Sequence, residues 1–135
     1  MIKYLADSNI LGYFARNSSA ALQKRMLAAR KKQEIAISAI TLAETRFGLA
    51  LLQADDKRRR TVDLLLKEFA VLSWTGAAAD RCGEIAAHLQ QTGQAIGVMD
   101  TQIAAHTLVL DLCLLTHNTR HFERVPGLKL QDWMV

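Results

Sequence analysis

The sequence has no apolar run near the roughly 20 residues that a membrane-spanning helix needs. It also has no signal-peptide pattern, because its N-terminus begins directly with a strand-like segment. The two cysteines, Cys82 and Cys113, lack the spacing and the neighbouring histidines of a metal motif. Their apolar surroundings indicate buried thiols. These absences favour a cytoplasmic protein with no membrane partner.

Several catalytic patterns are missing as well. There is no G-x-S-x-G element, and Ser8 has no histidine near it in the sequence, so a serine nucleophile is not indicated. A Walker A pattern is also absent, which argues against a nucleotide-driven motor. No repeat, linker or low-complexity segment divides the chain. Its 135 residues predict a single domain, residues 1–135, large enough for a proper core.

Charge is distributed unevenly along a chain of otherwise ordinary globular composition, with 50% apolar and 22% charged residues. Residues 1–60 hold 12 Lys and Arg against 5 Asp and Glu, whereas residues 61–135 hold 5 against 8. The basic clusters are Lys24-Arg25, Arg30-Lys31-Lys32 and Lys57-Arg58-Arg59-Arg60. Such runs suit contact with a polyanion or an acidic partner, although each can also be a solvated helix surface.

Strand-like and helix-like segments alternate along the chain. Strands are predicted at residues 2–6, 34–38, 71–74, 112–116 and 128–130. Helices are predicted from residue 8 to about 16 and at residues 20–31, 41–53, 57–69, 77–91 and 100–110. This alternation predicts an α/β domain whose parallel sheet is covered by helices on both faces. Ligands of such sheets bind beyond the carboxyl ends of the strands.

Three acids lie where apolar residues are expected. Asp7 follows the first strand, and Glu44 and Asp100 share helical stripes with mostly apolar residues, namely Ile40, Phe47 and Leu51 for Glu44, and Ile103, Ala104 and Thr107 for Asp100. A carboxylate that faces a core is costly unless it is paired, hydrogen-bonded or bound to a metal. Three such residues, far apart in sequence, predict one acidic pocket that a hard cation neutralises.

Each acid also has a simpler explanation. Asp7 can cap the first helix, Asp100 can cap a later one, and Glu44 can be the reciprocal partner of a capping box that begins at Thr41. Capping does not explain why all three lie beside apolar stripes. Carboxylates brought together raise one another's pKa, and Mg²⁺ or Mn²⁺ removes that penalty through oxygen ligands. A water on such an ion is easier to deprotonate, so phosphodiester cleavage then needs no protein nucleophile.

Several segments resemble a known family when taken together. They occur in the order YLADSNI (residues 4–10), SAITLAE (38–44), GVMDTQIAAH (97–106), LTHNTRHF (115–122) and VPGL (125–128). This series resembles the VapC-type toxins of the PIN-domain ribonuclease family, the toxic half of bacterial toxin–antitoxin pairs. The resemblance covers nearly the whole chain.

The resemblance implies a three-layer α/β/α fold with a mainly parallel central sheet. It places the family's metal-binding acids on Asp7, Glu44 and Asp100, and a fourth polar site position, acidic in many PIN domains, on Asn118. Two positions depart from the family pattern. Ser8 replaces the commoner threonine and keeps the hydroxyl, and His121 is the second such position.

His121 stands where many relatives carry an acid, which leaves both one-metal and two-metal catalysis open. The resemblance further implies Mg²⁺- or Mn²⁺-dependent cleavage of structured RNA, in a tRNA or rRNA loop. It also implies homodimers and a hetero-oligomer with a VapB-type antitoxin whose tail fills the groove. Two alternatives are an inactive RNA- or partner-binding module and a receiver-like signalling domain. The receiver-like domain is disfavoured because no lysine ends the strand at residues 112–116.

Overall fold

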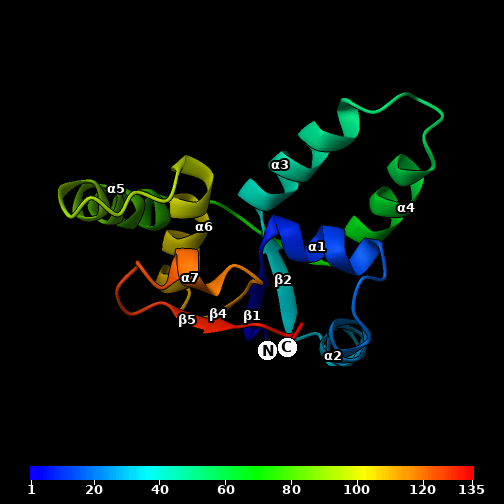
Figure 1. The fold of residues 1–135 in the computed structure, drawn as a ribbon, viewed down its shortest axis with the longest axis horizontal. Helices are drawn as coiled ribbons and strands as arrows, with labels where there is room; N and C mark the ends of the chain where they lie inside the picture. Colours follow the sequence, from blue (N-terminus) through cyan, green and yellow to red (C-terminus); the bar gives the residue numbers. More distant parts are fainter.

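A five-stranded sheet forms the centre of the structure, a computed structural model that describes residues 1–135. All neighbouring strands pair in parallel, in the order β3-β2-β1-β4-β5 (Figure 1). The strands are short: β1 (Tyr4–Ala6), β2 (Ile35–Ser38), β3 (Ala70–Leu72), β4 (Cys113–Leu115) and β5 (Lys129–Gln131). The predicted parallel sheet is confirmed.

Seven helices surround this sheet: α1 (Ser8–Ala15), α2 (Ala20–Lys31), α3 (Ala39–Ala50), α4 (Lys57–Leu66), α5 (Gly76–Gln91), α6 (Val98–Val109) and α7 (Thr119–Phe122). Figure 1 shows α5 and α6 on one side and α1, α2 and α4 on the other, which confirms the α/β/α layers. None of these helices is both long enough and apolar enough to pass through a bilayer.

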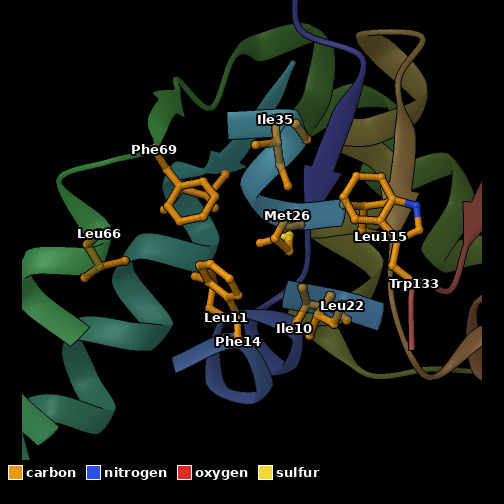
Figure 2. Packing of buried hydrophobic residues seen from close by; sticks show 13 residues of the cluster. Ile10, Leu11, Phe14, Leu22, Met26, Ile35, Leu66, Phe69, Leu115 and Trp133 are labelled. Atoms are coloured by element: carbon orange, nitrogen blue, oxygen red, sulfur yellow. The ribbon is translucent and has the colours of Figure 1, made fainter. Parts of the chain in front are cut away.

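The two halves of the core lie on opposite faces of the sheet. On β1, Leu5 packs with the buried residues of α5 and α6, whereas Ala6 packs with those of α1 and α2. This follows from the two-residue period of a strand, which sends successive side chains to opposite faces. Figure 2 shows the second set, where Phe14 and Met26 pack against the sheet with Leu115. The central strands β1, β2 and β4 are therefore largely apolar on both faces, as expected of a covered parallel sheet.

The strand order reverses direction at β1. The chain goes from β1 outward to β2 and β3, and then returns to place β4 and β5 on the other side of β1. In open parallel sheets, the crevice at such a switch point, beyond the carboxyl ends of the strands, is the usual ligand site. Asp7 follows β1 and Thr116 follows β4, so both residues lie at this point.

Two helices begin earlier than predicted. Ser38 is the N-cap of α3, because its hydroxyl accepts the N–H of Ile40 at 3.0 Å. The alternative of a capping box from Thr41 to Glu44 is therefore wrong. Helix α6 begins at Val98 after Gly97, so Asp100 lies inside the first turn and is not an N-cap. Gly97 has a φ of 96°, a left-handed conformation that glycine adopts at no steric cost.

Other boundaries differ by a few residues. Helix α4 ends at Leu66, whereas the apolar spacing predicted an end near Phe69. Phe69 is buried in the same cluster as Leu66, but it follows a turn in which its N–H bonds to the carbonyl of Leu66. Burial thus continues the helical spacing beyond the end of the helix. The short helix α7 was not predicted, because four residues are too few to show a period.

The central strand gives a direct test of this core. Leu5→Ala removes a fully buried side chain from β1 and should lower the free energy of unfolding by about 2–5 kcal/mol. Leu27→Ala on α2 is the matched control, since Leu27 is 56% exposed and its loss should change stability by less than about 0.5 kcal/mol. Urea denaturation of both variants measures the difference, and equal values would contradict the assignment of Leu5 to the core.

Candidate active site

Asp7 is the most buried acid of the chain, with 5% of its surface exposed. It is the N-cap of α1, and its Oδ1 accepts the N–H of Ile10 at 2.9 Å. The capping explanation is therefore correct for Asp7. The cap does not exclude a second role, because only one carboxylate oxygen makes that bond and the residue lies at the switch point of the sheet.

The surroundings of Asp7 oppose its ionisation. Burial is the main cause that raises the pKa of Asp7 from its ordinary value of 3.8 to about 6, and the charges of Asp100 and Glu44 add to it. Hydrogen bonds from the Thr116 hydroxyl and the Ile10 N–H act in the opposite direction. Asp100 and Glu44 therefore lie close enough to Asp7 to disfavour its ionisation, although they come from other elements.

Glu44 lies in the middle of α3 and accepts a hydrogen bond from the hydroxyl of Ser8, the first residue of α1. Its helical stripe does not face the core as predicted, since Phe47 is 66% and Leu51 is 72% exposed. Helix α3 extends away from the sheet (Figure 1), which leaves these two side chains exposed. Of the stripe, Glu44 lines a groove between α1, α3 and α4. Glu44 itself is half-buried.

Asp100 lies in the first turn of α6, and its Oδ2 is 2.8 Å from Nε2 of His121 in α7. The same Nε2 is 3.0 Å from the carbonyl oxygen of Ile96. Both oxygens only accept hydrogen bonds, so this nitrogen carries the proton and donates to both. The stripe below Asp100 is buried as predicted, but its carboxylate is 41% exposed. Of the three acids, only Asp7 is a core residue.

Asn118 reaches the site through its main chain. Its N–H donates to the hydroxyl of Thr116 at 3.0 Å, and this hydroxyl in turn donates to Asp7. The Asn118 side chain is exposed at the start of α7 and makes no capping hydrogen bond. The main chain of Asn118 therefore positions the Thr116 hydroxyl, while its side-chain amide remains free.

The donor chemistry of this edge fits a hard divalent cation. The three side chains offer carboxylate oxygens, the ligand type that Mg²⁺ and Mn²⁺ prefer, and a cation would relieve the unfavourable ionisation of Asp7. In the present arrangement, no three His, Cys, Asp or Glu side chains are close enough together to hold a metal ion. Ser8 and His121 hold oxygens of Glu44 and Asp100, so binding an ion requires these side chains to move.

Two polar pairs near the site were not found from the sequence. His106 of α6 is fully buried, with Nδ1 2.8 Å from the hydroxyl of Ser38, and burial lowers the pKa of this imidazole. This pair joins α6 to the start of α3. His117 donates from Nδ1 to Oδ2 of Asp132 at 2.8 Å, across the ends of β4 and β5. Neither pair has a sequence signal, because the partners are brought together only by the fold.

A groove of about 570 Å³ is lined by α1, α3 and α4, and of the three acids it includes Glu44. Its apolar lining includes Leu11, Leu49, Leu52 and Val62, and its charged lining consists of Arg16, Glu44, Lys57 and Arg58. Three cations thus border a groove that has a single acid at its inner end. A larger hollow, of about 820 Å³, lies between α3 and α4 and does not include any of the three acids.

Comparisons with known proteins agree with this geometry. The profile of the PIN domain family matches residues 4–128. The tRNA(fMet)-specific endonuclease VapC of Shigella flexneri is 33% identical over 133 residues, which cover 98% of this chain and 99% of that protein.

Solved structures give the same result. The DNA-bound VapBC of Salmonella typhimurium superposes with a TM-score of 0.90 at 30% identity, covering 98% of this chain and 99% of that one. VapBC-1 of nontypeable Haemophilus influenzae superposes with a TM-score of 0.84 at 31% identity over the full length of both chains. These matches exclude the receiver-like alternative. The chain belongs to the PIN domain family, and within it to the VapC-type toxins.

Proposed function

We propose that this protein is the toxin of a type II toxin–antitoxin system and that it cleaves structured RNA with the help of Mg²⁺ or Mn²⁺. The observation that carries the proposal is the buried Asp7 at the switch point of the sheet, whose pKa is raised to about 6 by burial and by the nearby charges of Asp100 and Glu44. A carboxylate placed at this cost in stability is typical of a functional site.

In this proposal Asp7, Glu44 and Asp100 hold the cation, with Asn118 as a fourth polar group. When bound, the cation supplies a Lewis acid that activates water and neutralises charge on the scissile phosphate. The protein groups position the ligands. Ser8 orients Glu44, His121 orients Asp100, and the Thr116 hydroxyl orients Asp7.

The RNA is the polyanion that the uneven charge of the chain suits. Arg16, Lys57 and Arg58 border the groove that contains Glu44. The RNA backbone can therefore lie along these basic side chains while one phosphate reaches the metal-binding carboxylates. The named relative from Shigella flexneri acts on tRNA(fMet), which supports a loop of tRNA or rRNA as the substrate class. With such a substrate, we infer a cytoplasmic location.

A VapB-type antitoxin is the proposed partner, in a hetero-oligomer built on a toxin homodimer. The VapBC complexes of known structure support this assignment. The antitoxin tail would lay apolar side chains against Leu11, Leu49 and Val62 in the groove. An arginine on that tail can then pair with the carboxylates in place of the cation. Inhibition follows because tail and RNA occupy the same groove.

RNA cleavage tests the role of Asp7 directly. Asp7→Asn should lower RNA cleavage in Mg²⁺ by about a hundredfold or more, because it removes a ligand charge while keeping an oxygen that accepts the Ile10 N–H. Asp80→Asn, an exposed and unpaired acid on α5, is the matched control and should cut RNA at the wild-type rate. Single-turnover cleavage of a tRNA transcript measures both. Wild-type activity in Asp7→Asn would end the assignment.

Asp7 should also make the stability of the metal-free protein depend on pH. The folded-state pKa of Asp7 lies above its unfolded value, so folding favours the protonated carboxyl. The contribution of Asp7 to the free energy of unfolding is therefore most favourable below about pH 4. It falls by about 3 kcal/mol as the pH rises through about 6. In EDTA at pH 7.5, Asp7→Asn should therefore be more stable than wild type, by up to about 3 kcal/mol.

The difference between the two proteins should shrink toward zero as the pH falls from 6 to 4, which thermal or urea denaturation at several pH values measures. The pH dependence of other groups cancels because both chains share them. A variant that is less stable than wild type by the same amount at every pH would show that burial does not disfavour the charge of Asp7.

Metal binding to the three acids should stabilise the folded protein. Mn²⁺ at a hundredfold excess over its Kd should stabilise the wild-type protein by about 2.7 kcal/mol, because the ion binds only the folded pocket. Asp100→Asn should reduce this gain, since it removes one of the three charges. Melting temperatures with and without Mn²⁺ measure the effect without RNA. An identical Mn²⁺-induced shift in wild type and variant would remove Asp100 from the ligand set.

A further inference from the structure

Arg16 ends α1 and has a guanidinium group without an acidic partner. It makes no ion pair, whereas Arg30, Arg46 and Arg58 each pair with an acid. Its Cζ lies 5.3 Å from the centroid of the Tyr13 ring. Its Nη1 lies only 3.2 Å from the point where a Cβ would stand on Gly12. The side chain is therefore folded back along α1, toward the acids.

Ser8, Gly12 and Arg16 form one stripe on α1, because they are spaced by four residues. All three line the groove that contains Glu44. The guanidinium lies beside Gly12, which is one helical turn, about 5.4 Å, from Ser8. Since the Ser8 hydroxyl bonds to Glu44, Arg16 presents its charge about one turn away from the acidic site.

The aromatic ring below Arg16 is itself held in place. His117 contacts Tyr13 edge-on, with ring centroids 5.7 Å apart and an interplanar angle of 84°. Its Nδ1–H donates to Asp132, whose other oxygen accepts the N–H of Met134 at 2.9 Å. His117 also directly follows Thr116, the residue that binds Asp7. The segment Thr116-His117 therefore contacts both Asp7 and the Tyr13 ring that lies against Arg16.

The charges of the groove favour an anion at Arg16. Of its three cations, Arg58 is paired with Asp56 at 2.8 Å, whereas Arg16 and Lys57 have no acidic partner. The only acid in the lining, Glu44, is occupied by Ser8. A planar guanidinium matches the oxygens of a phosphate through two parallel hydrogen bonds. A strand of RNA brings such phosphates at regular spacing.

We propose that Arg16, supported by Tyr13 and Gly12, binds a backbone phosphate of the RNA next to the phosphate that is cleaved. This subsite rests on the proposed cleavage of RNA and adds to it the direction in which the strand leaves the acids, along α1. Tyr13 and His117 are positioning residues, because they contact Arg16 or its support and not the RNA phosphate.

The test measures RNA binding in the Asp7→Asn background, with a tRNA(fMet) transcript as the probe. Arg16→Met should lower the affinity about tenfold and reduce the slope of log K against log salt concentration by about 1, the share of one phosphate contact. Arg16→Lys should keep the slope and lose part of the affinity, since it keeps the charge without the planar fork. Arg81→Met, an exposed and unpaired arginine on α5, should match the parent in both quantities.

A second measurement locates the contact. Replacing single phosphates of the transcript by uncharged methylphosphonates should weaken binding to the parent at the position next to the cut. At that position only, Arg16→Met should cause no further loss. The same additional loss at every position would show a diffuse charge effect, and the subsite would be wrong.

The outcomes separate this subsite from the proposed function. If wild type cleaves the transcript but Arg16→Met binds RNA with the parental affinity and slope, the subsite alone is wrong. If wild type fails to cleave RNA while binding still depends on Arg16, the proposed function alone is wrong. If Arg16→Met leaves RNA binding intact and weakens neutralisation by a co-expressed antitoxin, Arg16 is an antitoxin contact and the subsite is again overturned.

Discussion

The hydrogen bonds of the buried Asp7 carboxylate hold together the edge of the sheet at which the strands end. The same side chain caps α1 through the Ile10 N–H and accepts the hydroxyl of Thr116, so it joins the end of β1 to the end of β4. These two bonds only partly offset the cost of placing its charge in the core, since the pKa of Asp7 remains raised. The divalent cation proposed for this site would offset the remaining cost.

The other two acids are placed by contacts between helices. Ser8 of α1 bonds to Glu44 of α3, and His121 of α7 bonds to Asp100 of α6. The buried pair of His106 and Ser38 then joins α6 to the first residue of α3. The distance between the acids therefore depends on helix caps and on buried polar pairs, and less on the strands, which are only three or four residues long.

Sequence patterns predicted the parts of this arrangement that depend on local order. The alternation of strands and helices predicts the parallel sheet, and the position of Asp7 after β1 predicts its place at the edge. The patterns failed where tertiary contacts decide. Thr41 matched a capping box, but Ser38 caps α3 because β2 ends directly at the helix. The pair of His117 and Asp132 exists only because β5 lies beside β4.

Gly12 shows how the groove and the acidic edge are connected. A glycine inside a helix lowers helix stability by about 1 kcal/mol relative to alanine, which is a large loss for α1 with its eight residues. Its missing side chain leaves the space that the Arg16 guanidinium occupies between Tyr13 and the groove. The result is an acidic site whose approach is basic. In the proposed function, such a groove attracts RNA and equally accepts a protein segment that presents an arginine to the acids. The same charge pattern would then favour both the substrate and the proposed antitoxin tail.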